Sequence, residues 1–339
     1  MDLKKNRPVA IWLFIGAAMI AVQILLGGIT RLTGSGLSIT EWKPILGALP
    51  PMNEHDWNIA FEKYQQIAQF KYIHNYFSLA DFKSIYFWEW LHRNWARFMG
   101  IVFIVPFVWF IYKRRIDRSM LWPMAILFLL GALQGAIGWI MVASGVGTDL
   151  VYVSHIRLAA HFIAALILLV YVVWFALKIS VPDFKKQNIP SIKYFGLLLL
   201  AVLTVQLIYG AFMAGTHAAK SSITWPTING QWVPNMSDGG IFHNLLAIQF
   251  IHRGLAYLIT LLVIVFTVML YKQSKATVLY KLRNVPLLIT LLQVTLGVLT
   301  LMNYLTNAKL SLAITHQFVG ILLLTSLVVV YFYSAKRIK

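Results

Sequence analysis

Four histidines stand at matching places in the two halves of this chain. EWLHR carries His92 and LAAHF carries His161, while QFIHR carries His252 and ITHQF carries His316. Two imidazoles on facing helices are the usual axial ligands of a haem iron, whereas two imidazoles with few carboxylates make a poor cage for another metal. A lone histidine would be interpreted as structural. The repetition instead predicts two bis-histidine haem sites, His92 with His161 and His252 with His316.

Glu89 distinguishes the first of these sites from the second. It stands three residues before His92, whereas Gln249 holds the corresponding place before His252. Residues three apart share a helix face, and a carboxylate at membrane depth is costly enough to suggest a function. Beside a haem it can accept a proton or stabilise developing positive charge. We therefore predict that Glu89 is catalytic; the alternative is that it only pairs with Arg93.

Several arginines lie near the predicted outer ends of apolar segments. Guanidinium groups bind carboxylates such as haem propionates through paired hydrogen bonds, although lipid phosphate or water is an alternative partner. The remaining five histidines, at 55, 74, 155, 217 and 243, are interpreted as interfacial or structural. The candidate propionate contacts are Arg31, Arg93, Arg97, Arg157 and Arg253.

The composition places these residues in a membrane. The chain has 339 residues, of which 59% are hydrophobic and 12% charged. A helix that crosses a bilayer needs about 20 apolar residues, so we predict an all-α polytopic protein with each key histidine about seven residues, or roughly 10 Å, below the outer end of its span. The eight predicted spans are about 9–30, 85–111, 121–143, 154–178, 194–216, 245–271, 285–303 and 309–334.

The net charge of +18 follows the predicted topology. Every basic cluster falls on one side of the eight-span arrangement, so the positive-inside rule predicts that both termini are cytoplasmic. The charge therefore indicates orientation and attraction to anionic lipid rather than a nucleic-acid partner. The absence of cysteine excludes disulfides and thiolate ligands. The clusters are Lys4, Lys5 and Arg7; Lys113, Arg114, Arg115 and Arg118; Lys178, Lys185, Lys186 and Lys193; Lys272, Lys275, Lys281 and Arg283; and Lys336, Arg337 and Lys339.

The chain also repeats outside the histidine motifs. Leu133-Gln134 with Gly138 recurs as Leu292-Gln293 with Gly297, and Gln23 has a counterpart in Gln206. These matches predict two tandem, pseudo-symmetric four-helix bundles, residues 1–180 and 181–339. The first has a long outer loop, 31–84, in which residues 56–70 are expected to form an amphipathic helix on the outer membrane face.

Longer motifs identify a family resemblance that runs through nearly the whole chain. The sequence is similar to the haem A synthase family of bacterial and mitochondrial membrane enzymes. Some members have a cysteine pair in their outer loops; this chain has none and resembles the cysteine-free subgroup. The motifs are GGITRLTGSGLSITEWKPILGALPP at 27–51, FWEWLHRNWARFMG at 87–100, LQGAIGWIMVASG at 133–145, IRLAAHF at 156–162 and VQLIYGAFMAG at 205–215.

The resemblance implies an activity and a role for each half. It implies that His92 and His161 hold the substrate haem O, that His252 and His316 hold a haem B cofactor, and that Glu89 is catalytic. The implied reaction oxidises a porphyrin methyl to a formyl, which gives haem A for terminal oxidase assembly. It also implies the bacterial cytoplasmic membrane as location, haem O synthase as substrate donor and an unidentified electron donor, and it allows a homo-oligomer.

Two other classes of protein remain as alternatives. A dihaem b-type cytochrome that passes electrons between quinol and another carrier would have the same histidine pairs. A transporter built from paired repeats would be expected to have helices broken at the middle of the membrane. Glu89 argues against the cytochrome, because an electron conduit needs no carboxylate beside only one of its haems.

Overall fold

The computed structural model describes residues 3–41, 46–236 and 239–336. This part of the chain is helical, with only isolated β-bridges, and eight of its helical segments are long and apolar enough to cross a membrane. The prediction of an all-α polytopic protein with eight spans is confirmed. Trp42, Arg337 and Lys339, which belong to motifs and clusters named above, lie outside the described residues.

The spanning helices are joined by short elements. The long helices are α1 (Leu3–Leu32), α4 (Leu79–Tyr112), α5 (Arg118–Val142), α6 (His155–Ser180), α7 (Pro190–Gly215), α9 (Leu245–Tyr271), α11 (Val285–Met302), which α10 (Val278–Lys281) precedes in the same span, and α12 (Lys309–Ser334). The short elements are α2 (Glu54–Gln65), α3 (Ala68–Tyr72), α8 (Gly240–His243) and the 3-10 turns η1 (Leu46–Ala48), η2 (Asp183–Lys185) and η3 (Ala218–Ser221).

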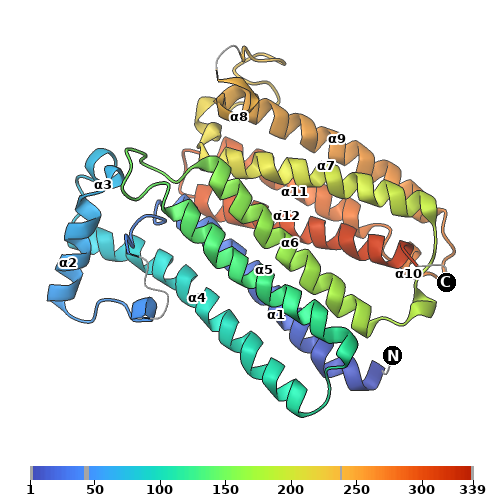
Figure 1. Cartoon of the computed structure of the whole chain (residues 1–339). Coiled ribbons are helices and arrows are strands. Elements are labelled where there is room, and N and C mark those ends of the chain that lie inside the picture. The colour runs from blue at the N-terminus through green and yellow to red at the C-terminus, as the bar shows by residue number, and fades with distance from the viewer. Residues whose placement is uncertain (1–2, 42–45, 237–238, 337–339) are drawn as a thin grey trace.

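The long helices form one bundle with two sets of contacts (Figure 1). In the first set, α1 packs against α4 and α6, and α5 packs against α6. In the second, α7 packs against α9 and α12, and α11 packs against α12 and α9. The two sets meet where α6 contacts α7 and where α12 contacts α1 and α6, around a shared apolar core. The boundary between halves at residue 180 remains a prediction.

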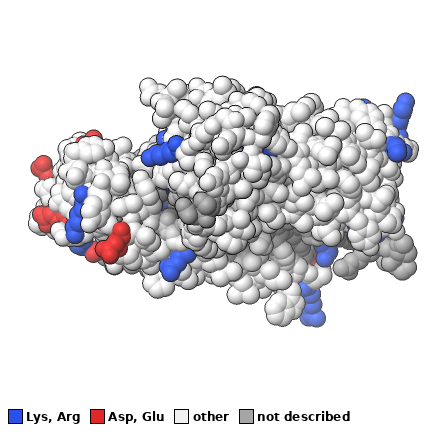
Figure 2. Space-filling model, turned by 90° about the horizontal axis from the view of Figure 1, so that it is seen from above, with Lys and Arg blue, Asp and Glu red and all other residues white. Residues whose placement is uncertain are grey.

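Charged side chains gather at the two ends of the bundle. Figure 2 shows a broad surface without them, and the acidic residues in this view lie at the end where α2 and α3 project. Large apolar side chains such as Trp122, 78% exposed, cover the sides. Helix α1 begins and α12 ends at the opposite end from α2 and α3 (Figure 1). Such a surface suits lipid around the sides and water at both ends, so this is a multi-pass membrane protein.

Helix α4 begins earlier than expected. It starts at Leu79 rather than near residue 85, because Ser78 and Asp81 form a capping box: Ser78 N donates to the Asp81 carboxylate at 2.9 Å, and Asp81 N donates to Ser78 Oγ at 3.3 Å. His92 is therefore 92 − 79 = 13 residues into its helix, whereas His161, His252 and His316 are 6, 7 and 7 residues into theirs. The expected seven-residue spacing is wrong for His92 alone.

The predicted outer helix exists, but it docks on α4 and is broken. Helix α2 ends at Gln65 and α3 begins at Ala68. The aromatic face of α2 packs on the outer end of α4, with ring centroids 5.0 Å apart for Trp57 and Tyr86 and 5.3 Å for Tyr64 and Phe82. Packing against α4 buries Tyr64 and Phe82 fully and shields Trp57 and Tyr86 in part. The segment is therefore docked on α4, and its location at the outer membrane face stays a prediction.

Candidate active site

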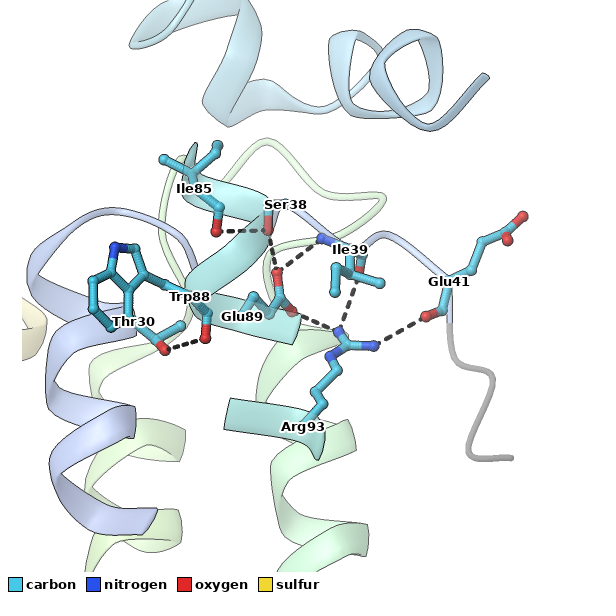
Figure 3. Close-up of polar contacts among 8 residues, drawn as sticks. All are labelled: Thr30, Ser38, Ile39, Glu41, Ile85, Trp88, Glu89 and Arg93. Atoms are coloured by element: carbon cyan, nitrogen blue, oxygen red, sulfur yellow. Dashed lines mark hydrogen bonds and ion pairs between the residues drawn. The ribbon is translucent and has the colours of Figure 1, made fainter. Parts of the chain in front are cut away.

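Glu89 lies buried between α4 and the segment that follows α1. Its side chain is 3% exposed, and its carboxylate accepts three hydrogen bonds (Figure 3). Ser38 Oγ donates to Oε2 at 2.7 Å and the Ile39 backbone N–H donates to the same oxygen at 2.8 Å, while Arg93 Nη2 donates to Oε1 at 2.6 Å. The Ile39 amide and the Arg93 guanidinium can only donate, so both carboxylate oxygens face hydrogen-bond donors.

Arg93 connects this carboxylate to the loop. Its Nη1 donates to the Glu41 carbonyl at 3.1 Å and its Nη2 donates to the Ile39 carbonyl at 2.9 Å (Figure 3). The ion pair between Glu89 and Arg93, which was the structural alternative to a catalytic role, is therefore present. It is one part of a network of four residues, which we call the Glu89 clamp: Ser38, Ile39, Glu89 and Arg93.

Glu89 has an electrostatic effect on Tyr64, which lies in the cap formed by α2 and α3. Tyr64 hydrogen-bonds to His74 Nδ1 at 2.6 Å. Burial raises the pKa of the Tyr64 phenol, and the charge of Glu89 raises it further. A cavity of about 140 Å³ beside the clamp is lined by Arg93 and Trp139 among others. It is large enough for a few water molecules.

The second half repeats this arrangement with the opposite hydrogen-bonding polarity. Gln249 is fully buried, and its Nε2 donates to the Ala218 carbonyl at 3.0 Å and to the Ser222 carbonyl at 3.1 Å. Its Oε1 accepts from Arg253, whose Nη1 also donates to the Thr227 carbonyl at 3.2 Å. The loop of the first half presents donors to a carboxylate, and the loop of the second presents acceptors to an amide.

The four histidines have equivalent surroundings. Each ring lies against a glycine of another helix, His92 on Gly27 and His252 on Gly210 for example. A methyl group added to these glycines would lie 3.2 and 3.4 Å from Cε1 of the ring; at Gly138 and Gly297 the same distance to His161 and His316 would be 3.1 and 3.0 Å. At Gly27, Gly138 and Gly297 an added methyl would crowd the ring, whereas at Gly210 it would make an ordinary van der Waals contact.

The donor set fits a haem in each half. His92 lies within electrostatic range of His161, and His252 of His316. His316 Nδ1 lies 3.1 Å from the Gln293 carbonyl, which suits an N–H at Nδ1 and makes Nε2, now 3.3 Å from the Gln293 amide, the nitrogen that would bind iron. Nδ1 of the other three rings is buried without a hydrogen-bond partner among the described residues. No group of three or more His, Cys, Asp or Glu that could hold an ion occurs in the described ranges. Two imidazoles suffice only when a macrocycle supplies the remaining ligands.

Comparison with known proteins shows the family of the chain. A family model described as cytochrome oxidase assembly protein (COX15-CtaA) matches residues 10–328. The chain belongs to this family. Relatives named heme A synthase are 38% identical in Flavobacterium psychrophilum, over 96% of this chain and 97% of the relative, and 40% identical in Rhodospirillum centenum, over 95% and 87%. A third, from Nitrosomonas eutropha, is 37% identical over 95% and 92%.

This member of the cytochrome oxidase assembly protein family carries one motif four times. Comparison of the two halves of the sequence revealed only part of it. Each histidine-contacting glycine follows a glutamine by four residues, and the amides of Gln23 and Gln293 lie 3.3 Å from Nε2 of His92 and His316. Two matches between halves were noted from the sequence, but not that all four helices share one pattern. The signal is QILLG at 23–27, QGAIG at 134–138, QLIYG at 206–210 and QVTLG at 293–297.

The five candidate propionate arginines have different surroundings in this family member. Arg93 and Arg253 are engaged in the two clamps described above. Arg97 donates to Asn94 Oδ1 at 2.6 Å, and Arg157 donates to the Ile140 carbonyl at 2.9 Å. Arg31 reaches across to the second set of helices, where it donates to the carbonyls of Ala214 and Gly215 at the end of α7. Their contact with propionates remains a prediction.

Proposed function

We propose that this membrane protein is an oxidoreductase that converts haem O to haem A and thereby serves terminal oxidase assembly. The observation that carries the proposal is the match, over nearly the whole chain, to relatives named heme A synthase. In the reaction a porphyrin methyl becomes a formyl. With the oxygen counted as water, the methyl and one water together give the formyl, four protons and four electrons. We propose that this proceeds through successive hydroxylations and loss of water.

We propose that His92 and His161 hold the substrate haem O, and that His252 and His316 hold haem B. The asymmetry of the two halves supports this assignment, because Glu89 precedes His92 by three residues whereas Gln249, which has no charge, holds the same place before His252. When bound, haem B supplies one-electron transfer. An amide that is locked between two carbonyls and an arginine has no proton to exchange, which suits a site that only carries electrons.

Glu89 is the proposed catalytic residue. A carboxylate has about four lone-pair positions, and three are used by Ser38, Ile39 and Arg93. The remaining position can accept a proton from the methyl group as it is oxidised, and the charge can stabilise positive character there. The three donors fix the orientation of the carboxylate, which lowers the cost of placing it at the moment of reaction.

The arrangement in the membrane completes the proposal. We propose residues 1–180 and 181–339 as the two halves, and the distribution of the basic clusters supports cytoplasmic termini. The cap of α2 and α3 and the Glu89 clamp then lie toward the outer face. Haem O synthase is the expected substrate donor. The four electrons released from the methyl pass through the haem B half to a one-electron acceptor, so in this proposal the redox partner that the sequence suggested as an electron donor takes electrons instead.

The proposal is tested in a host that makes haem O but no haem A. Expression of the chain should yield haem A by chromatography of extracted haems. His161→Ala should abolish haem A and leave haem B bound, whereas His316→Ala should lose haem B. Haem O without haem A, with the wild-type protein present in the membrane, would contradict the function. Loss of haem B from His161→Ala alone would reverse the two halves.

A further inference from the structure

A cationic cluster lies where the two sets of helices meet at the outer ends of α1 and α7. Arg31, in the last turn of α1, donates to the carbonyls that end α7, and its guanidinium lies 5.5 Å over the Tyr152 ring. The His217 ring lies 4.7 Å from the same tyrosine, and Lys309 lies 4.4 Å over the Tyr304 ring. These side chains come from four different segments, so the cluster forms only in the folded bundle.

Three polar atoms in this cluster are buried and lack partners. They are Nε of Arg31, Nε2 of His217 and the hydroxyl of Tyr304, none of which makes a hydrogen bond to any described residue. Buried polar groups are normally paired, and an unpaired one is costly. An arginine N–H, an imidazole and a phenol that share this condition at one place indicate a missing acceptor.

Among the described residues, no ion pair joins the cations of this cluster to a carboxylate. Arg31, Lys220 and Lys309 interact electrostatically with one another and with His217. The ion pairs of the described residues involve Lys5, Lys63, Arg93 and Lys186 instead. Burial, followed by the charges of Arg31 and the two lysines, lowers the pKa of His217 to about 3, so its ring is neutral at pH 7 and can donate one N–H.

We propose that Arg31, His217, Tyr304, Lys220 and Lys309 form a binding site for an oxyanion at the outer face between the two halves. Three cations and two neutral donors suit the oxygens of a carboxylate or a phosphate. We name this group of five residues the oxyanion cluster. Nothing in the catalytic proposal uses His217, Tyr304 or the two lysines.

The position of the cluster leaves two sources for the oxyanion. Arg31 follows Gly27 by four residues and Ala214 follows Gly210 by four, so the cluster lies about one helical turn, roughly 6 Å, beyond the level of His92 and His252. A haem propionate can reach this level from either site. The phosphate of an outer-leaflet lipid can reach it from the surface. The first source rests on the proposed haem sites, and the second does not.

The first arm of the test uses haem B and haem B dimethyl ester, whose propionates are uncharged, on the haem-depleted full-length protein in a non-ionic detergent. If propionates occupy the cluster, the wild type binds haem B about tenfold or more tightly than the ester, a factor expected of one or two charged hydrogen bonds. Lys309→Gln and Tyr304→Phe should reduce that ratio toward one. Arg31→Gln should do so too, and the two milder variants keep the test readable if it folds poorly.

The second arm uses nanodiscs that contain phosphatidylglycerol or the matching uncharged diacylglycerol. If lipid phosphate occupies the cluster, phosphatidylglycerol should raise the unfolding temperature of the wild type more than that of Lys309→Gln or Tyr304→Phe. Lys71→Gln, an exposed outer-face lysine on α3 away from the cluster, is the control and should behave as wild type in both arms. Both readouts are independent of haem A formation, so they can succeed where the proposed function fails. The inference is overturned if the variants match the wild type in both arms.

Discussion

The replacement of Glu89 by glutamine is the most informative perturbation of the clamp. Gln249 holds the corresponding place in the second half, which at first suggests that glutamine would be accepted. The partner atoms argue otherwise. Gln249 faces two carbonyls with its amide nitrogen, whereas residue 89 faces the N–H of Ile39 and the guanidinium of Arg93. In either orientation of a glutamine at 89, its NH2 group meets a donor.

The magnitude follows from these contacts. An unsatisfied buried donor costs about 1–3 kcal/mol, and the loss of one partner from a buried ion pair costs about 3–5 kcal/mol. Arg93 retains two carbonyl acceptors in the variant, so its loss of Glu89 costs less than a fully broken ion pair. We expect Glu89→Gln to lower the local stability by about 2–3 kcal/mol. Loss of the charge should also slow haem A formation by about a hundredfold or more.

The assay separates these two effects. Haems are extracted from Glu89→Gln protein made with a haem O supply, and thermal unfolding is recorded on the same preparation. Ser38→Ala is the matched variant, because it removes one donor and keeps the charge; it should reduce haem A formation by about tenfold. Wild-type haem A and wild-type unfolding in Glu89→Gln would refute the reasoning. Normal haem A with reduced stability would leave the clamp a purely structural feature.

Three further predictions concern the histidines and the glycines beside them. His252→Ala should remove the tightly held haem B, seen as loss of the low-spin absorption spectrum; an unchanged spectrum would contradict axial ligation by this residue. Gly297→Ala should weaken low-spin character at His316 because its methyl would lie 3.0 Å from the ring, while Gly210→Ala at 3.4 Å should be tolerated; equal spectra would show that the glycine contact does not matter. The pKa of His217 is lowered on folding from 6.5 to about 3, so its stabilising contribution is complete above pH 6.5 and is lost as pH falls toward 3, where the unfolded chain binds the proton first. His217→Gln should therefore lose less stability than wild type between pH 7 and pH 4, measured by thermal unfolding without added phosphate or anionic lipid, and identical pH profiles would count against this assignment.

Local pattern was sufficient for the spans but not for every helix end. The eight apolar segments were predicted because length and hydropathy depend on the bilayer alone. The extra outer turns of α4 were missed although SLAD at 78–81 carries a capping-box signal. The apolar pattern of 56–70 was assigned to the membrane surface because a sequence does not indicate which apolar surface is nearby. In the folded chain the outer end of α4 takes up part of this apolar face, a contact that the pattern did not indicate.

The site was predicted in its residue types more than in its contacts. Spacing indicated that Glu89 and His92 share a helix face, and repetition linked the four histidines. The clamp was out of reach, because Ser38 and Glu89 are separated by 51 residues and meet only after the loop folds back on α4. The same holds for Arg31, whose carbonyl partners lie 183 and 184 residues away. His217, interpreted as structural, is placed among cations that come from other segments.

Pigment extraction from the purified wild-type protein, made with a supply of haem O, tests the central claim most directly. The account predicts haem B together with haem O or haem A, because one half holds a cofactor and the other a substrate. Haem B alone, at two per chain, would contradict it and favour an electron-transferring dihaem cytochrome.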